Sequence, residues 1–545
     1  MGGMNPAQLV RDLVAGAKEI EPPKGPPRAA GGEPPEPVPA QPLIIWTEGE
    51  LPRMTDEAEA ALLTMPGAPR LFQRGGGLVQ VVPRAPANAR RIKRTAGGIA
   101  IGPVDLPRLV ELLTEAAYWE KPGKRKGKDG EGMVRRINAP HQVAAVLLSR
   151  GQWRLPHLTG IIEAPTLRPD GSVLEAPGYD PATGLYFDAS GTAFPPIIEQ
   201  PDRATALRGL DRLRELLREF DFATDTDRAV ALAAILTGLV RLSLTSAPLF
   251  GFSATVMGSG KTYLANVVSL IATGRQAPVM TPSRDEKEEA KALFAALLTG
   301  DGVLLLDNVE HQLSSDRLCA ILTSEVLRDR VLGVSKTAEA STACTLLVTG
   351  NNLELAGDLT ARALVCRLHP NCEHPEHRRF ERDLTEWIPK HRGELVAGAL
   401  TFLRGFLASG ERPTVEPWQR FPEWDGLIRA ALVWAGLPDL LESLRAVETA
   451  DPRRIEHEAV MRAWWAEFAD ELVTARELVA RAASAASGGD YAFRDALLNV
   501  AGEREEVNLR RLGKWLAKMA GRIQSGMRIE RETIRNGAQT WRVKR

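Results

Sequence analysis

Cysteine is scarce in this sequence of 545 residues, which has four in all: Cys319, Cys344, Cys366 and Cys372. Small secreted scaffolds held together by disulfides need more cysteines at regular spacing, so that class of protein is excluded. A reducing compartment fits this usage best, and we expect the protein to act in the cytoplasm.

Long apolar runs are also missing. The longest, Ala229–Val240, is bracketed by Arg228 and Arg241 and is too short to span a bilayer, so it indicates a buried helix. The first residues lack the basic-then-apolar pattern of a secretion signal. We therefore expect no membrane partner.

The chain has no formal net charge, because 69 Lys and Arg balance 69 Asp and Glu. The sequence also has no internal repeat. The overall charge thus excludes no class of partner, although its distribution along the chain is informative. The length predicts three or four domains, since one core rarely organises more than about 250–300 residues.

Composition divides the chain into five expected regions. Residues 21–42 hold nine prolines and cannot bury enough surface to fold, which indicates a linker. The expected regions are a disordered Pro-rich tail and linker (1–42), a mixed α+β accessory domain (43–200), a central α/β domain (201–410), a helical region (411–489) and a basic terminal module (490–545).

Within the accessory domain we expect short strands at 43–46 and 77–82, a helix from Leu106 to Trp119, and turns at 170–171 and 180–184. A basic loop at 121–128 is either solvated or in contact with nucleic acid. Five tryptophans of the helical region are expected in the core: Trp418, Trp424, Trp434, Trp464 and Trp465.

An apolar strand at 248–252 runs into a glycine loop and then a helix at 263–272. Glycines let backbone N–H groups surround phosphate oxygens, and the helix N-terminus adds its positive dipole end. Lys261 would charge-pair with the β and γ phosphates of ATP, and the Thr262 hydroxyl would ligate Mg²⁺. Thr255 replaces the usual first glycine. The expected nucleotide-binding residues are Gly258, Ser259, Gly260, Lys261, Thr262 and Tyr263.

A second apolar strand, 302–306, ends in Asp307, where a Mg²⁺ ligand is expected. Either Glu310 polarises the attacking water or Asn308 orients it, and we assign the role to Glu310. A third strand, 346–348, leads to Asn351, which is placed to sense the γ-phosphate because ligands gather at the carboxyl ends of such strands.

Arg362 follows the turn at 357–358 and is the candidate that completes a neighbouring subunit's site, with a surface salt bridge as the alternative.

The order of these motifs resembles superfamily 3-like AAA+ helicases, and more narrowly the helicase portion of phage and plasmid primase-helicases, the group that includes the poxvirus primase-helicase. The resemblance covers roughly residues 160–410 and rests on the glycine loop, 307–309, 329–333, 349–353 and 357–359. It implies an AAA+ P-loop NTPase core, a homo-hexameric ring, movement on DNA, and a bacterial host cell.

The family also implies a DNA-contacting hairpin between the second and third strands, which here offers Arg328, Arg330 and Lys336. Acidic metal-binding motifs of a primase are not found in residues 1–200. Any primase or polymerase is therefore expected on a separate chain.

Residues 508–545 contain eleven Lys or Arg against two Glu, a formal charge of +9. Apolar residues at helical spacing, followed by two strands around Asn536-Gly537, predict a winged-helix-like module that meets DNA phosphates. A merely solvated basic tail is the alternative. The expected contacts are Arg510, Arg511, Lys514 and Lys518.

Several potential zinc ligands crowd into one short segment: Cys366, His369, Cys372, His374 and His377. Zinc could bind such a set. However, Pro370 and Pro375 interrupt it and no second ligand pair stands at finger spacing, so a zinc site stays open.

Together these features predict an ATP-dependent DNA helicase, or an origin-loading replication protein, of a phage or mobile element. Its partner would be single-stranded DNA or an origin duplex. The alternative is a P-loop regulatory or defence ATPase that acts on protein partners.

Overall fold

The computed structural model describes residues 41–545 except for 85–86, 90–91, 95–96, 124–133, 284, 331–336, 371–373, 378–379, 489–490 and 536. Leu43–Arg545 form one compact unit. The tail and linker expected at 1–42 therefore lie outside the described residues, apart from the last two. In the described part, no helix has the length and apolar character needed to cross a bilayer.

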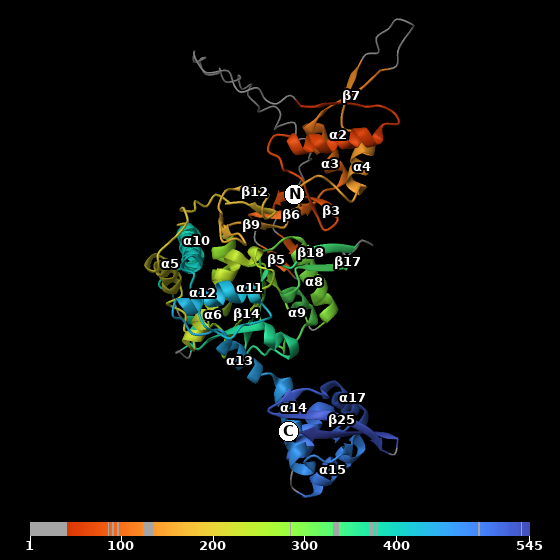
Figure 1. The fold of residues 1–545 in the computed structure, drawn as a ribbon, viewed down its shortest axis with the longest axis vertical. Coiled ribbons are helices and arrows are strands. Elements are labelled where there is room, and N and C mark those ends of the chain that lie inside the picture. The colour runs from red at the N-terminus through yellow and green to blue at the C-terminus, as the bar shows by residue number, and fades with distance from the viewer. Residues whose placement is uncertain are drawn as a thin grey trace, which may run out of the picture. The chain divides into compact units, whose positions relative to one another are not determined.

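Near the start of the compact unit, three helices pack against a small sheet (Figure 1). The sheet has the order β1 (Leu43–Ile45), β7 (Tyr118–Lys121) and β8 (Arg135–Ile137), and the helices are α2 (Leu51–Thr64), α3 (Leu106–Ala116) and α4 (His141–Ser149). Their apolar faces share one core, in which Leu109, Leu112 and Trp119 are buried.

The helix expected from Leu106 to Trp119 is too long by three residues. α3 ends at Ala116, and Ala117 is extended, with φ −143° and ψ 155°. Tyr118 and Trp119 instead pair with β1, because aromatic side chains fit a half-buried pleated surface well.

Short strands follow, all paired antiparallel except β9, which pairs parallel with β13, and they include the expected turns. They are β2 (Phe72–Arg74), β3 (Gly77–Pro83) and β6 (Ile99–Pro103) in one sheet, β9 (Gly160–Ile162), β12 (Gly178–Asp180) and β13 (Leu185–Phe187) in another, and the hairpin β10 (Thr166–Leu167) with β11 (Val173–Leu174). The turn at 170–171 joins β10 to β11 and the turn at 180–184 joins β12 to β13, as the sequence predicts.

A seven-stranded sheet forms the centre of the fold. Its order is β20 (Ala363–Leu368), β14 (Leu249–Ala254), β19 (Thr345–Asn351), β16 (Val303–Leu306), β15 (Val279–Met280), β5 (Ile92–Arg94) and β4 (Ala87–Ala89). The first five strands are parallel, whereas β5 and β4 pair antiparallel. All six residues of β14 are buried, as expected for a parallel strand covered on both faces. The chain is thus a mixed α/β protein with a parallel sheet.

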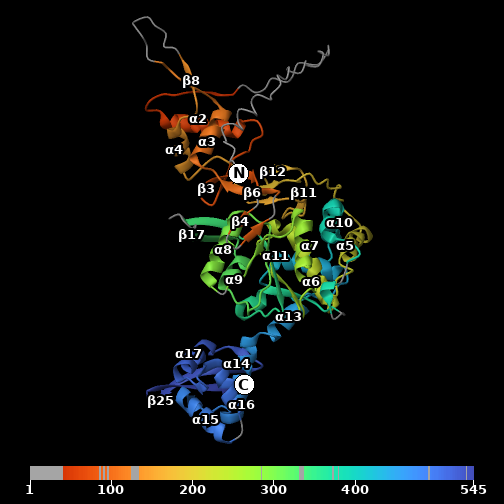
Figure 2. The same cartoon turned by 180° about the vertical axis from the view of Figure 1, so that it is seen from behind.

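Helices cover this sheet (Figures 1 and 2). They are α5 (Arg203–Leu216), α6 (Asp225–Val240), which continues into η1 (Arg241–Ser243), α7 (Lys261–Thr273), α8 (Glu286–Leu298), α9 (Asp316–Thr323) and α10 (Leu384–Ser409). In both views α5 lies beside α10. A Cβ on Gly209 would stand 2.2 Å from the Gly398 carbonyl oxygen, so this close crossing requires glycine.

The connections carry three further features. β17 (Val326–Arg330) and β18 (Thr337–Ser341) form the expected antiparallel hairpin between β16 and β19. The chain between β19 and α10 holds η2 (Gly357–Arg362) and η3 (Pro375–His377). Beyond α10 lie α11 (Pro422–Trp424), the π-helical turn η4 (Asp425–Arg429), α12 (Ala430–Trp434) and α13 (Leu441–Thr449).

Trp418, Trp424 and Trp434 are buried in the same core as the central sheet, as expected, and Trp464 is buried in the C-terminal core. Trp465 is partly buried against that second core.

The C-terminal part has its own core, which begins upstream of residue 490. Val460 on α14 and Leu478 on α15 pack with residues as far along as Val543. Its elements are α14 (Pro452–Phe468), β21 (Val473–Thr474), α15 (Ala475–Gly488), α16 (Ala492–Ala501), β22 (Gly502–Glu503), β23 (Glu506–Val507), α17 (Leu509–Met519), β24 (Ile523–Gln524), β25 (Met527–Arg535) and β26 (Ala538–Lys544). The expected helix and following hairpin correspond to α17 and to β25–β26.

Candidate functional site

A solvent-facing loop joins β14 to α7. Gly258 (φ 74°) and Gly260 (φ 85°) adopt left-handed conformations that other residues rarely take, and Gly260 caps α7. The Ser259 hydroxyl donates to the Val256 carbonyl oxygen at 2.6 Å, which closes the loop. Met257, at its tip, is 77% exposed. The loop therefore presents backbone groups and a helix N-terminus to solvent.

Lys261, the first residue of α7, points back under this loop. Its Nζ donates to the Val256 carbonyl oxygen at 3.2 Å and to Asn351 Oδ1, at the end of β19, at 2.7 Å. Burial lowers the pKa of Lys261, an effect that the negative charge of Asp307 opposes. The ammonium is therefore partly desolvated and held by two neutral oxygens.

Two hydroxyls meet on one oxygen of Asp307, just beyond β16. Thr262 and Thr349 donate to Asp307 Oδ1 at 2.8 and 2.6 Å. No described residue hydrogen-bonds to Asp307 Oδ2. Carboxylate and hydroxyl oxygens are the ligands that Mg²⁺ prefers, so this pair fits such an ion.

The two residues after Asp307 fold over the end of β19. Asn308 (φ 58°) donates its backbone N–H to Thr349 Oγ1 at 2.9 Å and its Nδ2 to Glu310 Oε1 at 2.8 Å. A Cβ on Gly350 would stand 2.7 Å from the Val309 carbonyl oxygen, so glycine permits this contact. Glu310 is exposed, and its carboxylate accepts the hydrogen bond from Asn308, the other candidate for the catalytic role.

Tyr263 lies in an aromatic cluster beside the loop. Its ring centroid is 6.0 Å from that of Phe220 and 4.9 Å from that of Phe380, and its hydroxyl accepts the Leu384 N–H at 2.6 Å. A Cβ on Gly260 would stand 3.6 Å from Phe220. The cluster thus adjoins the glycine loop.

Arg362 is not brought to this edge. It precedes β20, whose first residue pairs with Leu249 at the start of β14, whereas the glycine loop leaves the other end of β14. Its side chain is 13% exposed, donates to the Asp358 carbonyl oxygen at 2.7 Å and pairs with the Asp358 carboxylate at 3.3 Å. Arg362 therefore does not join the site of its own chain.

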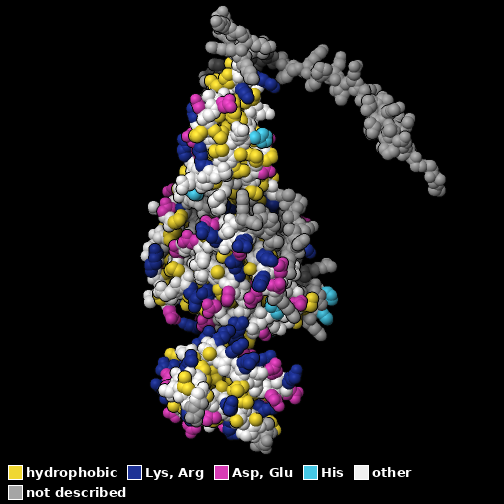
Figure 3. Space-filling model, turned by 90° about the vertical axis from the view of Figure 1, so that its right-hand side faces the viewer, with side chains coloured by type: hydrophobic (Ala, Val, Ile, Leu, Met, Phe, Trp, Pro, Cys, Tyr) yellow, Lys and Arg dark blue, Asp and Glu magenta, His cyan; other side chains and the backbone are white. Residues whose placement is uncertain are grey.

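The expected DNA contacts lie on two other elements. On the hairpin, Arg328 pairs with Glu339 across the strands and Arg330 is exposed, while Lys336 lies outside the described residues. The basic loop is described only at residues 121–123. Positive and negative side chains are mixed over the visible face in Figure 3.

Most cations on α17 lack the ion pairs that several cations of the following hairpin form. Arg510, Lys514 and Lys518 are exposed and form no ion pair within the described residues, whereas Arg511 donates to the Gly502 carbonyl oxygen at 2.7 Å and pairs with Glu503. Glu530 pairs with cations of the hairpin: Arg528, Arg542 and Lys544. Leu512, Leu516 and Met519 fill the buried face of the helix.

The Cys and His segment does not converge in the described part. Cys366 is fully buried in β20, and this burial raises the pKa of its thiol well above the usual value. Cys372 lies outside the described residues. Among those described, no three His, Cys, Asp or Glu side chains are grouped as metal ligands.

Sequence reasoning missed Thr349, which bridges Asp307 to Asn308. The missing signal is strand register: Leu306 pairs with Val348, which places the next residue of each strand side by side. Phe220 and Phe380 were missed because they lie far from the loop in sequence.

No protein-family model matches the sequence, and no curated protein is significantly similar to it. Solved structures that align with the chain include the apo NrS-1 C terminal region (12% identity, 81% of this chain, 100% of that chain, TM-score 0.35). Others are JCV helicase (12%, 47% and 70%, 0.20) and SCCmec type IV Cch, an active helicase (10%, 73% and 81%, 0.26). These TM-scores lie below 0.5, so the proposals below rest on the geometry of the chain itself.

Proposed function

We propose that this chain binds and hydrolyses ATP with Mg²⁺ at the glycine loop and uses the energy to unwind DNA, or to load at a replication origin, in a phage or other mobile element. The observation that supports ATP binding most strongly is the convergence of Lys261, Thr262, Asp307 and Asn351 beneath a loop of left-handed glycines. A helix N-terminus and a desolvated ammonium at one place suit a triphosphate.

Each residue has a distinct role in this proposal. Lys261 shifts from Asn351 toward the β and γ phosphates, which frees the Asn351 amide to meet the γ-phosphate. Thr262 and Asp307 hold Mg²⁺, which supplies neutralising charge to the phosphates. Thr349 fixes the Asp307 carboxylate. Glu310, steered by Asn308, accepts the proton of the attacking water.

The adenine base is proposed to stack at the aromatic cluster of Phe220, Tyr263 and Phe380. The rings adjoin Gly260, on the side of the loop where α7 begins. Offset and tilted ring contacts suit a planar heterocycle.

DNA binding is assigned to the C-terminal module, read as a winged helix, and to the hairpin β17–β18. The unpaired cations on α17 support this assignment, since exposed Lys and Arg that lack acidic partners are free to neutralise phosphates. The proposed assembly is a homo-hexameric ring in which Arg362 serves the neighbouring subunit.

The deciding experiment is an ATPase assay with and without single-stranded DNA, run beside size analysis with ATP. DNA-stimulated turnover by a ring-sized species is the expected result. Equal turnover with and without DNA would favour the regulatory or defence ATPase acting on protein partners. Absence of turnover under both conditions would overturn the assignment of ATP hydrolysis.

A further inference from the structure

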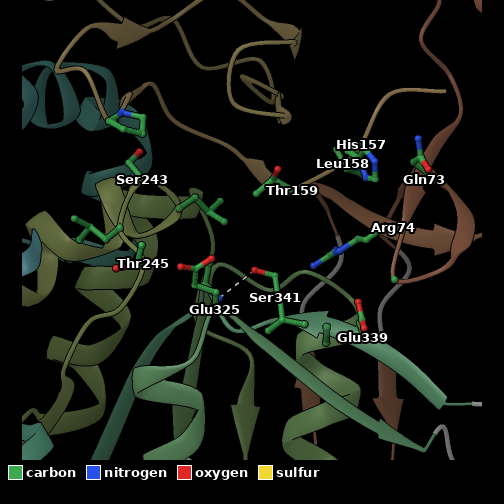
Figure 4. A pocket seen from close by; sticks show the side chains of 17 residues that line it. Gln73, Arg74, His157, Leu158, Thr159, Ser243, Thr245, Glu325, Glu339 and Ser341 are labelled. Atoms are coloured by element: carbon green, nitrogen blue, oxygen red, sulfur yellow. Dashed lines mark hydrogen bonds between the residues drawn. The ribbon is translucent and has the colours of Figure 1, made fainter. Parts of the chain in front are cut away.

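A cavity of about 410 Å³ lies away from the glycine loop (Figure 4). It is walled by the β2–β3 turn, residues 157–159, residues 242–245 and the hairpin β17–β18. Its lining includes the apolar residues Leu158, Leu242 and Val326 together with polar groups. The cavity is large enough to hold more than a bare ion.

Arg74 is the unusual member of this cavity. Figure 4 shows its side chain reaching from the end of β2 into the space that Thr159, Ser341 and Glu339 surround. Its Nη1 is buried beside Gly300 without a hydrogen-bond partner, and no described residue forms an ion pair with the guanidinium. Burial lowers the pKa of Arg74 to about 10, and no acidic group offsets this effect.

The neighbouring acids do not neutralise Arg74. Glu339 is already paired with Arg328, and Glu325 is exposed on the hairpin side of the cavity. The turn that follows Arg74 lies close against the hairpin, since a Cβ on Gly75 would stand 2.6 Å from the Glu339 carbonyl oxygen. The Arg74 guanidinium is thus partly buried and has no ion-pair partner among the described residues, so it can receive an anion from a ligand.

We propose that this cavity binds the phosphate of a nucleotide, at a second site separate from the glycine loop. A guanidinium presents a planar fork that matches phosphate oxygens. The Ser341 hydroxyl accepts the Ala343 N–H at 3.3 Å, which leaves its own proton free to donate to the same group.

The rest of the cavity suits the nucleoside. The apolar side chains of the lining would cover the sugar or base, and the Glu325 carboxylate would accept their N–H or O–H groups. The nucleotide is either free in solution or one unit of a single strand. None of these residues belongs to the glycine loop, so the inference does not depend on ATP hydrolysis there.

The test measures binding by calorimetry in the full-length Lys261→Ala chain, which disables the first site. AMP and a single-stranded oligonucleotide are titrated separately. Arg74→Gln is expected to weaken the binding of one of them by about tenfold or more, because a charge-assisted contact is lost. The matched control is Arg70→Gln, which removes an exposed arginine that pairs with Glu115 at 2.7 Å and should leave affinity unchanged.

The two titrations identify the source of the phosphate. Dependence of AMP binding on Arg74 assigns the site to a free nucleotide, and dependence of oligonucleotide binding alone assigns it to a strand. Binding of both probes that is indifferent to Arg74 overturns the proposal. The proposal is also overturned if both probes fail to bind.

Stability gives an independent readout. Arg74→Met should melt no lower than the parent chain without ligand, because it removes an unpaired buried charge; a clear drop in Tm would mean that Arg74 has a structural partner and would contradict the proposal. Val326→Trp, which places a larger side chain on the hairpin side of the cavity, should also weaken the binding. Retained affinity in that variant would place the ligand elsewhere.

Discussion

A lysine that served only to stabilise the fold would pair with a carboxylate, and Lys261 does not. Its two acceptors are a backbone carbonyl and the Asn351 amide oxygen, while Asp307 is occupied by two hydroxyls. The positive charge of Lys261 is therefore not neutralised by an ion pair and can attract an incoming anion. The site is partly buried, where electrostatic interactions are stronger than in water.

Replacing Lys261 with Ala is expected to reduce ATP turnover by at least about 100-fold, since no other described side chain brings a positive charge under the loop. The measurement is steady-state ATPase activity. Lys291→Ala is the matched control, because that lysine is on α8 and pairs with Glu288 at 2.8 Å. Normal turnover by the Lys261 variant would contradict the assignment of the loop.

Thr349 contacts Asp307 and Asn308, so we expect it to act through the Asp307 carboxylate rather than directly on a nucleotide. Thr349→Val removes the donor to Asp307 Oδ1 and the acceptor of the Asn308 N–H while keeping the shape of the side chain. We expect the Mg²⁺ concentration for half-maximal ATPase to rise by about 10-fold, the scale of a lost contact behind a metal ligand. Thr349→Ser should restore it. An unchanged Mg²⁺ requirement in the valine variant would mean that Thr349 does not position the carboxylate.

Glu310 and Asn308 can be separated, because they hydrogen-bond to each other but would act differently. Glu310→Gln keeps the shape and removes the base, so kcat should fall by about 100-fold with little change in KM. Asn308→Ala releases Glu310 and should have a smaller effect. If the Asn308 variant loses activity while the Glu310 variant keeps it, Asn308 orients the water and another acid is the base.

At the scale of elements, local pattern was informative wherever one strand or helix determines the outcome. The loop at 255–260, the apolar strand before Asp307 and the amphipathic helix α17 each carry their signal within about a dozen residues. These segments lie where the sequence predicts them.

The other parts of the fold depend on contacts between segments that are distant in the sequence. No local pattern in a single sequence predicts these contacts. The strands β4 and β5 extend the central sheet from residues nearly 200 positions upstream of β15, and Tyr118 leaves a helical pattern because β1 is available to pair with it. Thr349 meets Asp307 only through the register of β16 and β19. Such contacts follow from strand order, which composition and periodicity leave undetermined.

Three exposed cations of α17 form a candidate surface for DNA phosphates. Arg510, Lys514 and Lys518 recur at intervals of four and so share one helix face. Changing all three to Ala should weaken DNA binding and reduce the slope of log affinity against log salt by about 2–3, because each neutralised phosphate releases counterions. Basal ATPase should survive.

Arg511→Ala is the matched control, since Arg511 is already held by Gly502 and Glu503. The measurement is a DNA-binding titration at several salt concentrations. Equal slopes for the triple variant and the parent chain would exclude α17 as a phosphate-binding surface.

At the scale of the whole molecule, residues 43–200 and the central sheet are parts of one compact unit. Besides β4 and β5, buried ion pairs join them: Arg84 with Asp301, and Arg275 with Glu163 at 2.5 Å. Removing one partner of such a pair costs about 3–5 kcal/mol. Movement of β15 and β16 during a nucleotide cycle would therefore reach the accessory strands directly.

The position of Arg362 suggests that it acts on a neighbouring subunit. It lies at the end of the sheet opposite the glycine loop, so it does not reach the site of its own chain. An Arg362→Ala chain keeps an intact loop, and a Lys261→Ala chain keeps an intact Arg362. Each alone should be inactive. In randomly mixed rings about a quarter of the interfaces pair an intact loop with an intact arginine, so up to about that fraction of parental ATPase should return.

The assay is ATPase activity across mixing ratios, with co-assembly verified by size and by a tag on one chain. Arg412→Ala, an exposed arginine after α10, is the control and should be active alone. No recovery in verified mixed rings, or full activity of Arg362→Ala alone, would show that Arg362 does not complete a neighbour's site and that its pairing with Asp358 is its whole role.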